Sequence, residues 1–232
     1  MRSKTLAAIS MMACFLGTSA FAADKEAKVV DRLDASADLM SSMMKSGDKG
    51  VPQDLLDKAK CVVLVPGMKK GGFIVAAKYG RGFAMCRKAS GAGWSAPAAI
   101  RMEGGSVGFQ IGGSEQDVLL LVMNDTGMKH LISSKFTLGG DATVSAGPVG
   151  RDASAQTDAT LRSEMLSYSR SRGLFAGIAL TGATLRPDDD ANKELYGHEV
   201  SNEDILMGKV AAPAPAEKLV RSMSRDSARQ SK

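Results

Sequence analysis

Ser106 lies in the sequence GGSVG, residues 104–108, which has the letters of the G-x-S-x-G nucleophile elbow of serine hydrolases. An elbow serine is a nucleophile only where it joins a strand to a helix and is served by a histidine and an acid. Here the following residues, FQIGG, predict a strand, and His130 and His198 are the only histidines in the sequence. We therefore predict no catalytic role for Ser106 and interpret GGSVG as a bend bracketed by glycines.

Two other glycine-rich stretches match nucleotide-binding loops only in part. GAGWSA, residues 91–96, fits the dinucleotide fingerprint, but Pro97 follows where the helix of that fold has to begin, so we predict a hairpin turn. PGMKKGGFIVAAKYGRG, residues 66–82, lacks the GK[ST] ending of a phosphate-binding loop. The two histidines are isolated, and Asp188–Asp190 lack the ligand spacing of a calcium loop. The sequence therefore predicts no metal site, no cofactor and no enzymatic activity.

A local surplus of positive charge is the remaining candidate for function. Residues 58–102 carry nine Lys or Arg and no Asp or Glu, whereas residues 23–208 as a whole carry a net charge of −1. A local surplus of this kind favours an anionic ligand. The predicted lipid-binding residues are Lys58, Lys60, Lys69, Lys70, Lys78, Arg81, Arg87 and Lys88.

Two observations limit the interpretation of these charges. Alternation along strands would instead distribute them over an ordinary solvated surface, and Lys58 and Lys60 also suit the C-terminus of a helix. Aromatic residues make up 5% of the chain, which disfavours the stacking surface that single-stranded nucleic acid needs. We therefore expect no nucleic-acid ligand.

The first 22 residues have the features of a secretory signal peptide. An apolar run follows Arg2 and Lys4 and ends in AFA, residues 20–22, the small-x-small form that signal peptidase cleaves. Lipoprotein cleavage before Cys14 fits the residues around it less well. About 12 apolar residues are too few for a membrane span, which needs about 20. We expect a mature protein that is periplasmic or secreted from a bacterium and associates peripherally with membranes.

The helices that should support this surface follow from residue spacing. An amphipathic helix is predicted over residues 24–45, and a second, short helix from Pro52 to Lys60. Further short helices are predicted near residues 126–133 and in DDDANKELYG, residues 188–197. The apolar positions that recur along the first helix are Val29, Leu33, Ala37, Met40 and Met44.

From Cys61 onward the chain consists of short β-rich runs separated by glycines, with DVLLLVM, residues 117–123, as a strand buried on both faces. The short spacings predict hairpins, and the glycines predict bulges and bends. The predicted fold class is therefore α+β, with a strongly curved, mainly antiparallel or barrel-like sheet, an N-terminal amphipathic helix and a few short helices. We expect a single domain over residues 23–208, followed by a flexible basic tail over residues 209–232.

Cys61 and Cys86 remain in the chain once the signal peptide is removed. An even pair in an oxidising compartment favours a disulfide. Both cysteines also lie within apolar runs, which suits two buried free thiols equally well. The residues leave both alternatives open.

Seven segments in order resemble one known family, the SYLF domain, a lipid-binding domain also called the yeast actin-binding protein type. The resemblance covers residues 29–208. The segments are VPQDLLDKAKCVVLVPGMKKGGFIVAAKYGRG, GWSAPAAI, GGSVGFQIGG, DVLLLVMN, LGGDATVSAGPVGR, SYSRSRGLFAGIALTGATL and LYG.

The resemblance implies a non-enzymatic α+β domain that binds membrane lipids, with phosphoinositides as ligands of eukaryotic members and actin as a partner of some. It also implies that an N-terminal amphipathic helix contacts membranes. The part expected to apply to an exported bacterial member is affinity for anionic phospholipid. The alternative is an envelope structural or stress-related module that binds another protein, with Met40, Met43 and Met44 as an adaptable contact surface.

Overall fold

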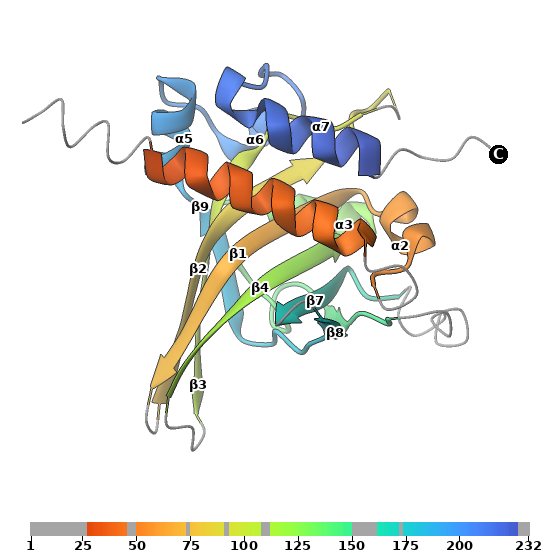
Figure 1. Ribbon diagram of the computed structural model, residues 1–232, viewed down its shortest axis with the longest axis vertical. Coiled ribbons are helices and arrows are strands. Elements are labelled where there is room, and N and C mark those ends of the chain that lie inside the picture. The colour runs from red at the N-terminus through yellow and green to blue at the C-terminus, as the bar shows by residue number, and fades with distance from the viewer. Residues whose placement is uncertain are drawn as a thin grey trace, which may run out of the picture.

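A strongly curled β-sheet with helices packed on it forms the body of the protein (Figure 1). The computed structural model describes residues 27–45, 50–72, 75–90, 93–107, 112–149, 162–171 and 174–226. After a first helix over residues 27–45, the elements are α2 (Gln53–Lys58), β1 (Cys61–Gly72), β2 (Val75–Cys86), β3 (Ala98–Val107), β4 (Gly112–Val122), α3 (Asp125–Ile132), β5 (Phe136–Thr137), β6 (Val144–Ala146), β7 (Met165–Ser171), β8 (Leu174–Gly177), β9 (Ala183–Pro187), α5 (Asp189–Tyr196), α6 (Asn202–Leu206), the 3-10 helix η3 (Ala214–Ala216) and α7 (Glu217–Asp226).

The sheet order is β5-β9-β3-β2-β1-β4-β7-β6, and β8 also pairs with β7. Of the pairings between the named strands, only that of β6 with β7 is parallel. The predicted fold class is therefore confirmed. The apolar run in β4 occupies a central strand, and Val118–Val122 are buried, as the sequence predicted.

Helices cover both faces of the sheet, so the protein has two hydrophobic clusters. One lies between the sheet and the first helix, α2 and α7; the other lies between the opposite face and α3, α6 and the β5–β9 region. Neighbouring residues of a strand alternate between them: Phe83 and Met85 belong to the first cluster, and Ala84 and Cys86 to the second. Alternation along β1 and β2 therefore decides which way each basic side chain points.

A bulge in β1 changes the direction of the sheet. The register of β1 shifts between Leu64 and Lys69, where Gly67 has a φ of 59°, which favours glycine. Gly82 of β2 faces this bend, because a Cβ atom there would lie 1.9 Å from the carbonyl oxygen of Leu64. These glycines permit the close strand contact that the bend requires.

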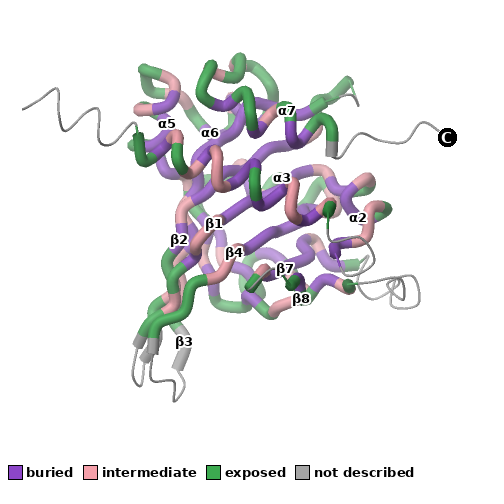
Figure 2. The backbone as a smooth tube through the Cα atoms, in the orientation of Figure 1, coloured by how far each residue is buried: buried purple, intermediate pink, exposed green. Residues whose placement is uncertain are grey.

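Beyond the bend, β1 to β4 project from the body (Figure 1). We call the described part of this projection the projecting arm, which comprises residues 69–72, 75–79, 103–107 and 112–116. In Figure 2 the body is mainly buried, whereas the arm is mainly exposed. The arm contains Gly104–Val107 as part of β3, so the predicted bend at GGSVG is wrong for these residues.

The first helix is packed on the sheet along its apolar side. Leu33, Ala37 and Met40 are 1% exposed or less, and Met43 is 1% exposed. The predicted amphipathic helix is confirmed. This side is not free to contact a membrane or a partner, however, so the expectation of an adaptable methionine surface at Met40 and Met43 is wrong.

Two asparagines fix α5 and α6 to β3. Asn192 accepts a hydrogen bond from the backbone N–H of Ala99 at 2.8 Å, and Asn202 donates to the carbonyl oxygen of Ala99 at 3.2 Å. Asn192 also donates to Asn202 at 2.5 Å, and both side chains are buried. The asparagines thus hydrogen-bond the backbone of β3 and place Asp188, at the start of α5, against the sheet.

The expectation of a flexible tail from residue 209 is wrong for residues 214–226. Residues Ala214–Ala216 and Glu217–Asp226 form η3 and α7, and Leu219 and Met223 are completely buried against the first helix. The apolar contact outweighs the polar composition of this segment. The predicted signal peptide, residues 1–22, lies outside the described residues.

Candidate functional site

The basic residues of the projecting arm lie on two opposite faces. Lys70 stands directly opposite Lys78 across β1 and β2, with Ser114 and Gly104 completing the row on β4 and β3. Neither lysine forms an ion pair within the described part of the chain. Since like charges in directly opposite positions repel, this row favours an external anion.

The other face of the arm has a mixed charge. Lys69 stands opposite Tyr79 on one side and Glu115 on the other, and Tyr79 stands opposite Glu103. Tyr79 is 43% exposed. This face therefore combines one cation, two acids and an exposed aromatic ring.

Three of the predicted residues have structural contacts in the body. Lys58 pairs with Asp54 within α2, and Lys60 pairs with Asp125 at 3.1 Å. Arg87 donates to the carbonyl oxygens of Leu56 and Ala59 at the end of α2 and lies over the Trp94 ring, 4.4 Å from its centroid.

Lys88, also predicted, is exposed on the body near the end of β2. The eight predicted residues therefore do not form one surface. Lys69, Lys70 and Lys78 are the members that the projecting arm brings together.

Arg81 belongs to a different group, which we call the arginine cluster: Arg81 of β2 and Arg101 of β3, which share the carboxylate of Asp188. Arg101 donates to Asp188 at 2.7 Å and to Asp190 at 3.1 Å, and Arg81 lies 3.3 Å from Asp188. Asp188 is completely buried.

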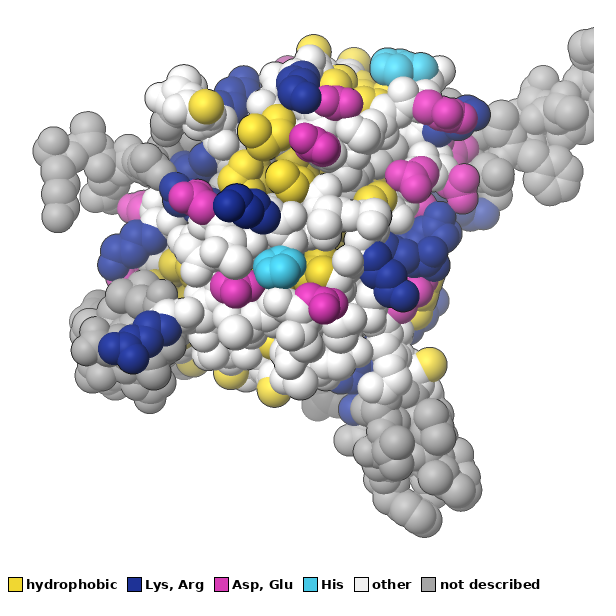
Figure 3. All heavy atoms as spheres, turned by 180° about the vertical axis from the view of Figure 1, so that it is seen from behind, with side chains coloured by type: hydrophobic (Ala, Val, Ile, Leu, Met, Phe, Trp, Pro, Cys, Tyr) yellow, Lys and Arg dark blue, Asp and Glu magenta, His cyan; other side chains and the backbone are white. Residues whose placement is uncertain are grey.

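The pKa values of Arg101 and of Arg32, on the first helix, shift in opposite directions for different reasons. The hydrogen bond to Asp188 raises the pKa of Arg101, whereas burial, followed by the charge of Arg81, lowers the pKa of Arg32. Figure 3 shows Lys and Arg side chains gathered beside Asp and Glu on one flank of the molecule.

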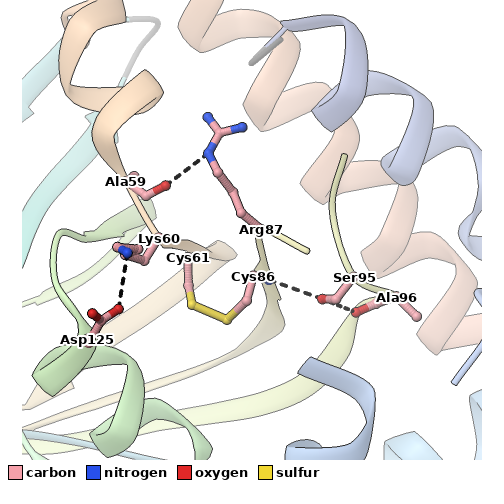
Figure 4. The surroundings of a disulfide bond; sticks show 8 residues. All are labelled: Ala59, Lys60, Cys61, Cys86, Arg87, Ser95, Ala96 and Asp125. Carbon is pink, nitrogen blue, oxygen red and sulfur yellow. Dashed lines mark hydrogen bonds and ion pairs between the residues drawn. A yellow bond between two sulfur atoms is a disulfide. The ribbon is translucent and has the colours of Figure 1, made fainter. Parts of the chain in front are cut away.

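Cys61 and Cys86 stand opposite each other at the ends of β1 and β2 and form a disulfide (Figure 4). Both cysteines are completely buried. The backbone N–H of Cys86 also donates to the hydroxyl of Ser95 at 3.1 Å. Of the two alternatives that the sequence left open, the structure contains the bonded one.

The described residues do not assemble the enzymatic sites considered from the sequence. Ser106 lies within β3 and not at a turn from a strand to a helix. His130 instead faces Glu164, with Nε2 3.6 Å from a carboxylate oxygen. Within the described ranges, no group of three or more His, Cys, Asp or Glu side chains is arranged to hold a metal ion.

The helices of the described ranges are also too short or too polar to cross a membrane.

Comparison with known proteins relates this fold to one family. A family profile described as "Las17-binding protein actin regulator", Ysc84, matches residues 103–225. The chain is 35% identical over 173 residues to the human SH3 domain-containing YSC84-like protein 1, which covers 74% of this chain and 50% of the human protein. It is also 33% identical over 177 residues to Protein YSC84 of Saccharomyces cerevisiae, covering 75% of this chain and 37% of the yeast protein.

The chain belongs to the Ysc84 family, whose domain is the SYLF domain. It spans half or less of the length of these relatives. The match to the Ysc84 profile continues to residue 225, which agrees with the burial of α7 and places this helix within the family domain.

Within this Ysc84 family domain, sequence reasoning did not find Arg101 and Tyr79 as neighbours of Arg81. Arg101 was visible as one of nine basic residues, but its pairing with Asp188 joins positions 87 residues apart. Only the tertiary fold brings Asp188 to Arg81 and Arg101, whereas Tyr79 and Arg81, two residues apart in β2, share a face of their strand.

Proposed function

We propose that this domain binds anionic phospholipid surfaces through the projecting arm and catalyses no reaction. Membership of the Ysc84 family supports a binding domain, because the family profile and the relatives are described by binding and actin regulation. The lipid ligand is our own inference from charge and exposure.

The observation that carries the proposal is the row of Lys70 and Lys78. The two cations face each other across β1 and β2, and the same row contains no acid. Lys69 adds a third, exposed cation on the other face. A phosphate-rich surface at the arm would relieve the repulsion between Lys70 and Lys78.

The expected strength is modest. A lysine near an anionic membrane contributes about 1 kcal/mol, so Lys70 and Lys78, which share a face, contribute about 2 kcal/mol before losses to salt. Binding should therefore be reversible and should weaken as the salt concentration rises.

Vesicle pelleting tests the proposal. The mature chain should pellet with phosphatidylcholine vesicles that contain phosphatidylglycerol. The variant K69Q/K70Q/K78Q should bind about 10- to 100-fold more weakly. Equal pelleting with pure phosphatidylcholine vesicles would contradict the proposal.

The control variant K45Q/K129Q/R162Q removes the same charge from exposed positions outside the arm. It should bind as the unmodified chain does. If it loses as much affinity as the arm variant, net charge and not the arm determines binding.

Protein binding is a second candidate. The relatives include LAS seventeen-binding protein 3 of yeast, and Leu174 in β8, which pairs with β7, is 65% exposed. Among the described strands β8 pairs only with β7, and a strand edge without a partner strand can pair with an extended segment of another protein. Actin filaments are the probe: Leu174→Lys should abolish co-sedimentation, whereas Met207→Lys, at another exposed apolar position, should not.

We further propose that the mature chain is exported to an oxidising compartment. Two features support this: the signal-like sequence of residues 1–22, and the disulfide between Cys61 and Cys86, because such bonds persist mainly outside the cytosol.

A further inference from the structure

One edge of the projecting arm has no strand beside it in the described structure. β4 pairs with β1 along its whole length, from Gly112 to Val122, whereas β7 pairs with the other edge of β4 only from Asp117 onward. We call residues 112–116 on this second edge the free β4 edge. Among the described residues, its backbone groups that point away from β1 have no partner strand, and a row of such groups can pair with a further strand.

The free β4 edge lacks most of the features that keep strand edges apart. Edges in natural proteins are often protected by lysine, proline or a bulge. Here the sequence is GGSEQ, and Gly113, Ser114 and Glu115 are exposed. The charged side chain in this sequence, Glu115, lies over β1, because a Cβ atom at Gly67 would lie 2.8 Å from one of its carboxylate oxygens. A partner strand can therefore approach the backbone of this edge.

The free β4 edge is complementary to a second copy of itself. In an antiparallel pair with twofold symmetry, the residue at the centre stands opposite its own copy, because opposite side chains point to the same face. β7 limits the available edge at Asp117, and β4 begins at Gly112, so these five residues are centred on Ser114. In this register the opposite pairs are Ser114 with Ser114, Gly113 with Glu115, and Gly112 with Gln116.

We propose that two copies of this chain associate through their free β4 edges, with Ser114 at the twofold axis. This register places no like charges directly opposite each other, whereas a register centred on Glu115 would oppose two carboxylates. Glu115 instead stands opposite Lys69 of its own chain, across β4 and β1. The arms of the two copies then form one continuous sheet, in which β4 and its copy are the central strands.

The interface is small, so the dimer is weak and reversible. Five residues of each copy form about four to six backbone hydrogen bonds between the strands. Interfaces of this size belong to transient complexes, and we expect a Kd on the order of 10 μM. Lys70 and Lys78 stand in the same row as Ser114, so the dimer aligns the lysines of both copies on one face. The association itself does not depend on the lipid binding proposed for these lysines.

Sedimentation equilibrium of the full mature chain, without lipid, tests the association. The average mass should rise from that of a monomer toward that of a dimer between about 1 and 100 μM protein. Ser114→Lys should weaken the dimer at least about 10-fold, because it places two lysines opposite each other at the axis. Ser106→Lys, in the matching GGS sequence of β3 at the opposite edge of the arm, should dimerise as the unmodified chain does.

Thiol cross-linking tests the register. Cys61 and Cys86 are bonded to each other, so Ser114→Cys leaves the mature chain with one free thiol. Air oxidation with copper phenanthroline should join two copies of this variant through a disulfide, because the two thiols meet at the axis. Ser106→Cys, whose thiol lies on the opposite edge of the arm, should cross-link at least about 10-fold more slowly.

The unmodified chain decides the inference even where a variant does not fold. A mass that stays monomeric up to about 100 μM protein would overturn the proposed dimer. A dimer that Ser114→Lys leaves intact, or equal cross-linking of Ser114→Cys and Ser106→Cys, would also overturn it, because the association would then use another surface. A monomeric chain that still binds anionic vesicles would refute the dimer and leave the lipid proposal standing.

Discussion

Two buried tyrosines differ in whether their hydroxyl groups are satisfied. The Tyr168 side chain is completely buried in the hydrophobic cluster that the first helix, α2 and α7 cover, and its hydroxyl has no hydrogen-bond partner in the described structure. The Tyr196 hydroxyl donates to the carbonyl oxygen of Pro97 at 2.8 Å. A buried hydroxyl without a partner destabilises the fold, whereas a paired one contributes about 1 kcal/mol.

Removing these hydroxyls should therefore have opposite effects. Tyr168→Phe is expected to leave the free energy of unfolding unchanged or to raise it by about 1 kcal/mol. Tyr196→Phe is expected to lower it by about 1 kcal/mol, and it controls for the general effect of the substitution. Urea unfolding measures both, and an equal loss in the two variants would contradict the assignment of Tyr168 as unpaired.

The same tyrosines predict how stability changes at alkaline pH. Burial raises the pKa of both Tyr168 and Tyr196 above the ordinary value of about 10. The unfolded chain then loses these protons first, so stability is complete below pH ~10 and falls above it, by at most about 1.4 kcal/mol per pH unit for each tyrosine. In urea titrations above pH ~10, Tyr168→Phe should show a smaller decline than the unmodified chain.

At the scale of elements, α7 is part of the core. Leu219 is completely buried, and Lys218 pairs with Asp34 and Asp38 of the first helix at 3.3 and 3.2 Å. Leu219→Ala should lower the free energy of unfolding by about 2–4 kcal/mol, whereas the exposed Arg221→Ala should change it by about 0.5 kcal/mol or less. A negligible effect of Leu219→Ala in urea unfolding would restore the interpretation of this segment as a free tail.

The disulfide joins the start of β1 to the end of β2. It connects residues 25 positions apart, and in the chain-entropy model a loop of this length corresponds to about 3.5 kcal/mol. The variant C61A/C86A should therefore unfold about 7–14 °C lower than the unmodified chain. Adding dithiothreitol should lower the midpoint of the unmodified chain only. A similar shift in C61A/C86A would assign the reductant effect to something other than this bond.

Residue patterns predicted the elements better than the site. The amphipathic helix, the buried strand in β4 and the short helices α3 and α5 follow from local spacing and charge. α7 was missed because its composition is mostly polar, and its burial depends on contact with the first helix. The bulge at Gly67 determines the faces of Lys69 and Lys70, and no local pattern specifies that register. Arg101 and Asp188, 87 residues apart, meet only through the tertiary fold.

At the scale of the whole molecule, the export proposal makes a chemical prediction. Protein purified from the cells that make it should have a mature N-terminus at Ala23 and a mass 2 Da below that of the fully reduced chain, because one disulfide removes two hydrogens. Intact-mass measurement with and without dithiothreitol checks both features. A retained Met1 or two free thiols would contradict export to an oxidising compartment.

The helical layer also bears on how a further domain could be joined to this fold. The first helix is described from residue 27, and α7 ends at Asp226; both helices lie at the end of the molecule away from the tip of the projecting arm (Figure 1). A domain fused to either end of this fold therefore starts from the helical layer. The tip of the projecting arm lies away from α7 and the first helix, so a vesicle bound there as we propose would lie on the opposite side of the molecule from a domain joined to α7 (Figure 1).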